Sequence, residues 1–177
     1  NMKGLIIIDM VNDFIEEGKD LEVPEGREII PNIENLIREA RDNDIPVIYS
    51  KDSHTKGDDE FEDWPPHSLQ DTEGSEVIKE LKPEKEDIII KKHRFSSFRD
   101  TELEERLKSL GVDEIILVGV LTDICILHAA IDAYYKDYEV IVPEDCVATV
   151  SQKKQEIALD HIENVLGFDV VESDEVI

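Results

Sequence analysis

Three absences restrict what this chain of 177 residues can be. It has only two cysteines, Cys125 and Cys146, which is too few for a disulfide framework, so a reducing, cytoplasmic setting is expected. It has no apolar run of about 18 residues or more, so we expect no transmembrane helix. Its first residues lead straight into a strand-like run, with no basic region or cleavage site, so we expect no signal peptide.

Positive charge is also scarce. The chain has 19 Lys and Arg residues against 44 Asp and Glu residues, a formal net charge of −25. Without a basic patch there is nothing to bind phosphates, which argues against nucleic acid or an anionic membrane as a partner. The composition instead favours a small-molecule substrate. With 40% hydrophobic residues and few glycines and prolines, the chain is expected to form one globular domain over residues 1–177.

Apolar runs alternate with amphipathic segments along the chain. The predicted strands are Gly4–Ile8, Ile45–Ser50, Asp87–Ile90, Ile115–Val118, Glu139–Val142 and an edge strand at Asp169–Val171. The predicted helices are Ile29–Asn43, a short one within Glu73–Lys82, Thr101–Leu110 with a Thr101–Glu104 capping box, the segment that begins at Cys125, and Ser151–Leu166 with Ile157, Ala158, Ile162 and Val165 facing inward. This order predicts an α/β fold with an open, mostly parallel six-stranded sheet and helices on both faces.

A strand, a tight turn and a helix surround Cys125. The apolar run Ile115–Val118 ends at Gly119, and an amphipathic segment begins at the cysteine after the polar pair Thr122–Asp123. The free N–H groups and the dipole at a helix start stabilise an anion, so the thiol is expected to be biased toward thiolate. The same N–H groups can hold an oxyanion. The alternative is a small buried core cysteine.

Polar residues follow the ends of successive predicted strands. Asp9, Asp52 and Lys92, with Lys91 as a rival for Lys92, come directly after the first three strands, and Cys125 follows the fourth. Sites in open α/β sheets form outside the carboxyl ends of the strands, so these groups should converge. A base, a cation and a thiol would make a nucleophilic site. The alternative is a set of ordinary polar strand ends in a chain rich in charge.

A possible metal site lies beside it. Asp52 and His54 follow the second strand, and Glu60 and His67 lie in the long polar loop Thr55–Thr72. Two carboxylates and two imidazoles suit a divalent transition metal such as Zn²⁺, with water in the open positions. The alternative is a group of solvated loop residues.

Several segments together resemble the isochorismatase-like cysteine hydrolase family, and within it most closely the nicotinamidases. The matching segments are Leu5–Phe14 (LIIIDMVNDF), Asp52-Ser53-His54, Trp64-Pro65-Pro66-His67 with Gln70 and Gly74, Lys92–Phe98 (KHRFSSF) and Gly119–Ala133 (GVLTDICILHAAIDA). The last is the most specific, and the WPPH element favours nicotinamidase over members that lack a metal.

The resemblance implies a role for particular residues. It implies a Cys125–Asp9–Lys92 triad, a cis peptide bond between Val120 and Leu121, and an oxyanion hole made by the N–H groups of Leu121 and Cys125. The implied metal ligands are Asp52, His54 and His67, with Glu60 where some members have a third histidine, and the implied walls of the ring pocket are Phe14, Leu21, Trp64 and Phe95.

The implied activity is hydrolysis of nicotinamide to nicotinate and ammonia through a thioester on Cys125, a step of NAD salvage. A divalent ion, Zn²⁺ or otherwise Mn²⁺ or Fe²⁺, would bind the pyridine nitrogen. The family also implies a homo-oligomer, a dimer or a tetramer. The chain departs from the family pattern at Ser68, Asp71 and Ala129, which leaves the exact amide open.

Three other functions are compatible with parts of the pattern. A related cysteine hydrolase could act on another amide, on a carbamoyl or ureido compound, or on isochorismate. A response-regulator receiver domain would also place acidic residues near Asp9 and Asp52 and a lysine on a later strand end, but it would not need the WPPH loop or Cys125. A catalytically silent interaction protein on the same scaffold is the third.

Overall fold

A parallel sheet forms the centre of the molecule. The computed structural model describes residues 1–177. The strands are β1 (Lys3–Ile8), β2 (Val47–Asp52), β3 (Ile88–Lys92), β4 (Glu114–Val120), β5 (Glu139–Pro143), β6 (Val147–Ala148) and β7 (Asp169–Val171). They lie in the order β3-β2-β1-β4-β5-β7, β6 pairs with β4, and every pair is parallel. The open parallel sheet and its six predicted strands are confirmed; only the two-residue β6 was not predicted.

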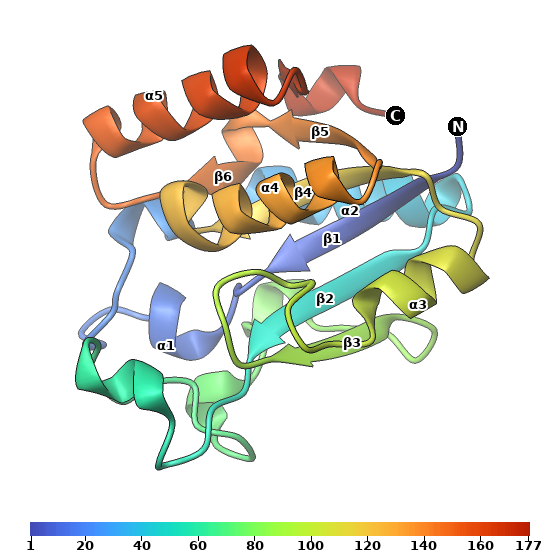
Figure 1. Cartoon of the computed structure of the whole chain (residues 1–177). Helices are drawn as coiled ribbons and strands as arrows, with labels where there is room; N and C mark the ends of the chain where they lie inside the picture. The colour runs from blue at the N-terminus through green and yellow to red at the C-terminus, as the bar shows by residue number, and fades with distance from the viewer.

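Helices cover both faces of this sheet, as predicted (Figure 1). They are α1 (Asn12–Ile15), α2 (Ile30–Asp42), α3 (Leu103–Ser109), α4 (Leu127–Tyr135) and α5 (Gln152–Asp160), with π-helical turns at Thr122–Ile126 and His161–Val165. Side chains of β1 alternate between two apolar clusters. Leu5 and Ile7 pack on the side of α2, whereas Ile6 and Ile8 pack on the side of α3 and α4.

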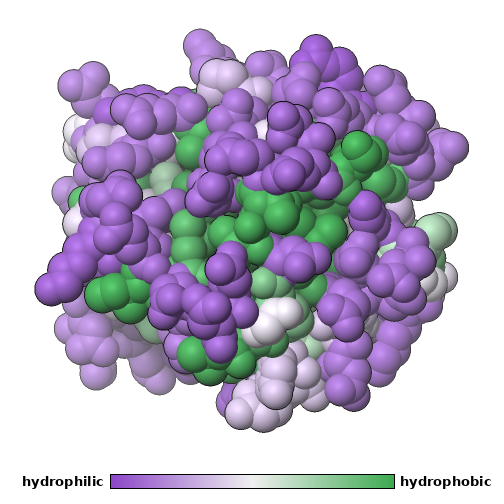
Figure 2. Space-filling view, turned by 90° about the horizontal axis from the view of Figure 1, so that it is seen from above, coloured by the Kyte–Doolittle hydropathy of each residue, from purple (hydrophilic) through white to green (hydrophobic).

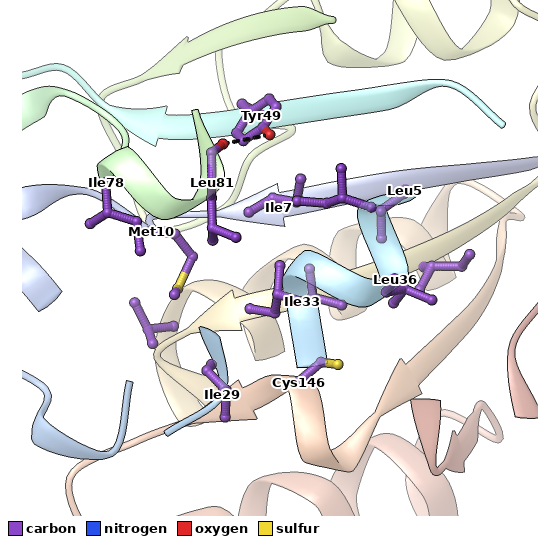
Figure 3. Packing of buried hydrophobic residues seen from close by; sticks show 14 of the residues in the cluster. Leu5, Ile7, Met10, Ile29, Ile33, Leu36, Tyr49, Ile78, Leu81 and Cys146 are labelled. Atoms are coloured by element: carbon purple, nitrogen blue, oxygen red, sulfur yellow. Dashed lines mark hydrogen bonds between the residues drawn. The ribbon is translucent and has the colours of Figure 1, made fainter. Parts of the chain in front are cut away.

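The core on the α2 side shows why that helix forms where it does. Ile33, Leu36, Ile37 and Ala40 recur at helical spacing and are all buried. Figure 3 shows Ile33 and Leu36 on the side of β1 that carries Leu5 and Ile7. In the same cluster the buried Tyr49 hydroxyl donates a hydrogen bond of 2.7 Å to the carbonyl oxygen of Leu81. The bond satisfies the one polar atom that this ring brings into the core.

Two helix predictions are wrong in detail. The capping box does not form, because Glu104 pairs with Lys108 and Lys136 while Thr101 donates to the Ser97 carbonyl and accepts from Leu103 N–H. The helix predicted within Glu73–Lys82 is two short 3₁₀ turns, at Glu73–Ser75 and Lys79–Leu81. Further 3₁₀ turns lie at Pro24–Arg27, Asp59–Glu62, Glu144–Cys146 and Ser173–Glu175.

The last helix faces the core less than predicted. Ala158 and Ile162 are buried, but Ile157 and Val165 are 60% and 62% exposed. The π-helical turn His161–Val165 changes the angular spacing after α5 and turns Val165 outward, whereas Ile157 precedes this turn and lies on an exposed side of α5. Figure 2, viewed from above Figure 1, shows hydrophobic surface surrounded by hydrophilic side chains on this side of the molecule. No helix of the structure combines the length and the apolar character needed to cross a bilayer.

The ends of β1 and β4 lie unusually close together. Ile8 is the register partner of Gly119, whose φ is +117°, a backbone conformation that side chains rarely allow. A Cβ at Gly119 would overlap the carbonyl oxygen of Ile8, which is backbone and cannot move aside. Asp9 follows Ile8 directly with a φ of +53°. The glycine therefore allows the approach that places Asp9 beside the turn after β4.

We expect Gly119→Ala to destabilise the protein by at least about 3 kcal/mol, since backbone strain and overlap act together. Gly57→Ala is the control, because nothing lies within 4 Å of a Cβ at that position. That control should change the free energy of unfolding by less than about 0.5 kcal/mol. Urea unfolding followed by circular dichroism measures both. Equal stability of Gly119→Ala and the wild type would contradict the argument.

Candidate active site

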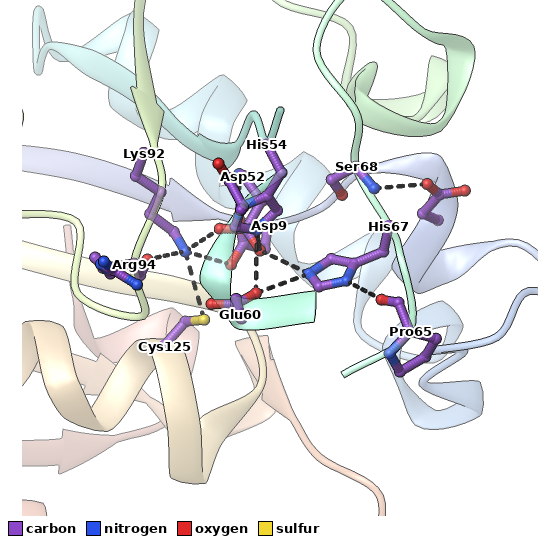
Figure 4. A network of polar contacts seen from close by, with 12 residues as sticks. Asp9, Asp52, His54, Glu60, Pro65, His67, Ser68, Lys92, Arg94 and Cys125 are labelled. Carbon is purple, nitrogen blue, oxygen red and sulfur yellow. Dashed lines mark hydrogen bonds and ion pairs between the residues drawn. The ribbon is translucent and has the colours of Figure 1, made fainter. Parts of the chain in front are cut away.

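The carboxyl ends of three strands and the turn after a fourth meet at one edge of the sheet. Asp9 follows β1, Asp52 ends β2 and Lys92 ends β3, and Cys125 lies in the π-helical turn after β4 (Figure 4). Asp52 and Lys92 are register partners in neighbouring strands. The convergence predicted from the strand ends is therefore present.

Lys92 is the centre of this group. Its side chain is fully buried, and its Nζ atom lies 3.0 Å from Asp9 Oδ2 and 3.5 Å from Cys125 Sγ. It also pairs with Asp52 Oδ1 and donates a 2.9 Å hydrogen bond to the carbonyl oxygen of Arg94. Side chains alternate along a strand, so Lys91 points to solvent. Of the two candidate lysines, only Lys92 lies in the site.

Asp9 keeps one oxygen available. Its Oδ1 accepts a 2.8 Å hydrogen bond from the backbone N–H of Asp52. Its Oδ2 is buried and accepts no hydrogen bond of good geometry, although the Lys92 ammonium lies 3.0 Å away. Burial and the neighbouring Asp52 raise the pKa of Asp9 to about 6, against the opposing effect of Lys92. A carboxyl with such a pKa can accept and return a proton near neutral pH.

Cys125 is only 4% exposed, yet it lines a cavity. Burial raises the pKa of its thiol well above the ordinary value, although Lys92 acts in the opposite direction. The expected bias toward thiolate is therefore wrong for the resting protein, because loss of hydration outweighs the nearby positive charge. A buried core cysteine would explain the burial alone. It would not explain a thiol facing a cavity beside a lysine and an aspartate.

A cis peptide bond and two backbone hydrogen bonds shape the turn that carries Cys125. The peptide bond between Val120 and Leu121 is cis, as the family resemblance implies. The carbonyl oxygen of Leu121 accepts hydrogen bonds from the N–H groups of Ile124 and Ile126, 3.1 and 3.2 Å long. These hydrogen bonds close the turn around Cys125, whose N–H is predicted to hold an oxyanion together with the N–H of Leu121.

Further contacts to this turn were not foreseen. The Thr122 hydroxyl donates to Gln155 of α5, and the Thr149 hydroxyl donates to Asp123. Gln155 in turn donates a 3.1 Å hydrogen bond to the carbonyl oxygen of Val147. Sequence patterns indicate no such role for threonine and glutamine, because their partners come from a segment about 25 residues or more away in the chain.

The four predicted metal ligands, Asp52, His54, Glu60 and His67, form one cluster. Their ligand atoms all lie within 4.8 Å of one another. The Nε2 atoms of His54 and His67 are each 3.1 Å from Glu60 Oε2, and 3.4 and 3.5 Å from Asp52 Oδ2. The buried Nε2 of His54 makes no hydrogen bond of good geometry. The His67 Nδ1 atom lies 2.7 Å from the Pro65 carbonyl oxygen, so its Nε2 also faces the centre. This donor set fits a divalent ion such as Zn²⁺.

Charges within the cluster are strongly coupled. Burial alone would lower the pKa values of His54 and His67, but Asp52 and Glu60 raise them to about 10 and about 9. Burial would raise the pKa of Glu60, but the two histidines lower it to about 2. The pKa of Asp52 lies well below its ordinary value, because Lys92 and the histidines outweigh its burial. The carboxylates are thus ionised and ready to act as ligands, and a metal would replace the imidazole protons.

A cavity of about 230 Å³ joins the two groups. Cys125 lies on its wall together with Asp52, Glu60 and His67. All four predicted wall residues, Phe14, Leu21, Trp64 and Phe95, also line it. Leu121, Ile124 and Val150 add apolar surface, and Asp20, Glu22, Asp123 and Lys154 were not predicted. Its size and its aromatic walls suit a small planar molecule.

Comparisons with known proteins agree with this geometry. A sequence profile described as the isochorismatase domain matches residues 3–175. The pyrazinamidase/nicotinamidase of Streptococcus mutans is 35% identical, over 96% of this chain and 99% of that one, with a TM-score of 0.91. N-carbamoylsarcosine amidase of Thermoplasma acidophilum is 36% identical over 99% of both chains, with a TM-score of 0.92. The pyrazinamidase of Pyrococcus horikoshii, solved in complex with zinc, is 29% identical over 97% of this chain and 99% of that one, with a TM-score of 0.91.

Proposed function

This chain belongs to the isochorismatase family of hydrolases, and on that basis we propose that it is a metal-assisted cysteine amidohydrolase that converts nicotinamide to nicotinate and ammonia. The main support is the position of the predicted metal cluster, which opens into the same aromatic-walled cavity as Cys125. Two relatives whose names include pyrazinamidase, one of them solved with zinc, also support it.

The nucleophile is formed by proton transfer within the buried group. The Oδ2 atom of Asp9, which accepts no hydrogen bond of good geometry, takes the proton of the Cys125 thiol, and the Lys92 ammonium stabilises the resulting thiolate from 3.5 Å. The thiolate then attacks the carboxamide carbon. The oxyanion that forms is held by the backbone N–H groups of Leu121 and Cys125.

Asp9 completes both halves of the reaction. It returns its proton to the nitrogen of the carboxamide, the C–N bond breaks, and ammonia leaves a thioester on Cys125. Asp9 next takes a proton from water, which attacks the thioester, and the C–S bond breaks with return of the proton to the thiol. A divalent ion bound by Asp52, His54, Glu60 and His67, with Zn²⁺ expected and Mn²⁺ or Fe²⁺ as alternatives, would supply a Lewis acid that binds the pyridine nitrogen and orients the ring.

The runner-up is hydrolysis of a carbamoyl or ureido compound by the same residues. One observation favours it: Lys154 lines the cavity and has no carboxylate within 4.0 Å among the ion pairs of the chain. An unpaired ammonium there would suit a substrate with a carboxylate, and N-carbamoylsarcosine amidase is a similar protein. Isochorismate is the other family substrate that the sequence left open.

The receiver-domain alternative does not fit the sheet. Receiver domains have the strand order 2-1-3-4-5, whereas here the order begins β3-β2-β1-β4-β5. Asp52 is also buried and paired with Lys92, so it is not available for phosphorylation.

Release of ammonia from nicotinamide tests the proposal. We expect wild-type protein to release it, Cys125→Ala to lose at least about 1,000-fold in kcat/KM, and chelation to reduce the rate until Zn²⁺ is restored. Cys146→Ala is the matched control, since Cys146 lies in the core away from the cavity. N-carbamoylsarcosine is assayed in parallel. Preference for it over nicotinamide would select the runner-up, and hydrolysis that survives Cys125→Ala would reject both.

The pKa of Asp9 predicts a pH dependence. Asp9 must be ionised to accept the thiol proton, so kcat/KM at saturating Zn²⁺ should rise with pH and level off above the Asp9 pKa of about 6. Below that value the slope should approach tenfold per pH unit. Asp9→Asn should abolish activity at every pH. A profile that stays flat from about pH 5 to pH 7 would argue against Asp9 as the base.

We further propose that the protein forms a homo-oligomer, a dimer or a tetramer. Tyr134 and Tyr135 at the end of α4 are 47% and 78% exposed, and Ile157 and Val165 are also exposed. Large apolar and aromatic side chains left exposed in this way would be covered in a contact between subunits. Light scattering should give a mass that is a multiple of 20.2 kDa, and Tyr135→Asp with Ile157→Asp should reduce it. A wild-type monomer at micromolar concentration would contradict the proposal.

A further inference from the structure

We propose that Asp58, which no sequence pattern singles out, is a positioning residue that orients His54 and thereby sets how tightly the Asp52–His54–Glu60–His67 cluster binds a divalent ion. The inference rests on the metal site of the proposed function. It concerns a residue outside that cluster and outside the cavity, since Asp58 lines neither.

The contact between the two side chains is short and partly buried. His54 Nδ1 lies 2.7 Å from Asp58 Oδ2, and the His54 side chain is fully buried. Asp58 is itself held by Thr55, whose hydroxyl donates to Asp58 Oδ1 over 2.6 Å and whose backbone N–H donates to Oδ2 over 3.2 Å. These two hydrogen bonds from Thr55 hold the Asp58 carboxylate in the position where it contacts the His54 imidazole.

This contact determines which nitrogen of His54 is free. An ionised carboxylate only accepts hydrogen bonds, so Nδ1 must carry the proton. In the neutral ring the lone pair is then on Nε2, which lies 3.1 Å from Glu60 Oε2 and makes no hydrogen bond of good geometry. Phe61 and His67 pack edge-on against the ring, with centroids 5.3 and 4.8 Å away, and limit its rotation. Nε2 is thereby aimed at the centre of the cluster.

The second histidine of the cluster provides an internal comparison. His67 Nδ1 also lies 2.7 Å from an acceptor, but that acceptor is the neutral carbonyl oxygen of Pro65. A hydrogen bond to a carboxylate is roughly twice as strong as one to a neutral group, and it makes the other nitrogen more basic. Of the two imidazoles, His54 should therefore be the stronger ligand, and Asp58 is the reason.

Two other roles for Asp58 are to cap a turn and to help bind a second ion. Asp58 precedes the 3₁₀ turn Asp59–Glu62 that carries Glu60, but its side chain does not cap that turn. His93 also lies near Asp58 and His54, so these three could hold a second ion. In that case His54 Nδ1 would bind metal rather than Asp58, and two ions per chain would be found.

Zinc affinity of the whole protein separates these roles. The dissociation constant is measured by competition with a chromophoric chelator at fixed pH, and thermal unfolding of the metal-free protein is measured alongside. We expect one ion per chain, a rise in the Zn²⁺ dissociation constant of about 10- to 100-fold in Asp58→Ala, and a smaller rise in Asp58→Asn, which can still accept a hydrogen bond. The visible spectrum of the Co²⁺ form should change in Asp58→Ala, because the His54 ring is no longer held.

Two controls keep the test specific. Asp59→Asn removes the neighbouring exposed carboxylate, which makes no ion pair, and should leave the dissociation constant unchanged. Thr55→Val removes one hydrogen bond of Asp58 while leaving its carboxylate, so it should weaken zinc binding less than Asp58→Ala.

Different results would reject the role of Asp58 and the proposed hydrolase function. Wild-type affinity in Asp58→Ala, a loss as large in Asp59→Asn, or a second ion that Asp58→Ala abolishes would overturn the role of Asp58 while leaving the metal-assisted hydrolase intact. No measurable zinc binding by the wild type would remove both the metal site and this inference. Failure to hydrolyse nicotinamide would bear on the proposed substrate alone, since the affinity is measured without substrate.

Discussion

A single buried ammonium organises the edge of the sheet. Burying the charge of Lys92 would cost several kcal/mol without partners, and Asp9, Asp52 and the Arg94 carbonyl oxygen surround it. The strands that carry these residues are neighbours, so the ion pairs follow directly from the order β3-β2-β1. Removing both carboxylates would leave an uncompensated charge in the interior. The polar cluster is therefore as much a requirement of the fold as it is a candidate for chemistry.

Asp52 connects the two halves of the site. Its Oδ1 pairs with Lys92 and its Oδ2 faces the two histidines. The same surroundings move the two carboxyl pKa values apart, because Asp52 has cations on both sides while Asp9 is buried next to another carboxylate. Two acids of the same type thus differ in proton affinity, since the neighbours of Asp52 favour its charged form and the surroundings of Asp9 raise its pKa to about 6.

Apolar patterning was enough to predict the sheet, since β1 and β4 are buried on both faces and read as continuous hydrophobic runs. It also located Asp9, Asp52 and Lys92, because parallel strands end at one edge. The cis bond before Leu121 came from family resemblance, and no local pattern would have predicted it.

Contacts that depend on loop geometry could not be predicted in this way. Asp58 reaches His54 only through the conformation of the loop after β2, and Gln155 reaches Thr122 across about 30 residues of chain. The exposed fractions of Ile157 and Val165 were mispredicted for a related reason. Helical spacing does not reveal whether another element covers the side that carries Ile157, and it does not reveal the π-helical turn that contains Val165. The high pKa of Cys125 likewise follows from burial depth, which the position of a residue near a helix start does not reveal.

The long excursion between β2 and β3 has a consequence for how such proteins diversify. His54, Glu60, Trp64 and His67 all belong to it, whereas Asp9, Lys92 and Cys125 sit on or next to strands of the sheet. An isolated bridge between His54 and Leu69 closes the excursion on itself, and a bridge between Val11 and Val77, with a 2.8 Å hydrogen bond from the Ser68 N–H to Asp13 Oδ2, joins it to the segment after β1. Three of the four candidate metal ligands therefore come from one segment of the chain, whereas the candidate base, lysine and nucleophile come from the edge of the sheet. Substitutions confined to the excursion would alter those three ligands and leave the residues at the edge of the sheet unchanged, so the two groups can vary independently in evolution.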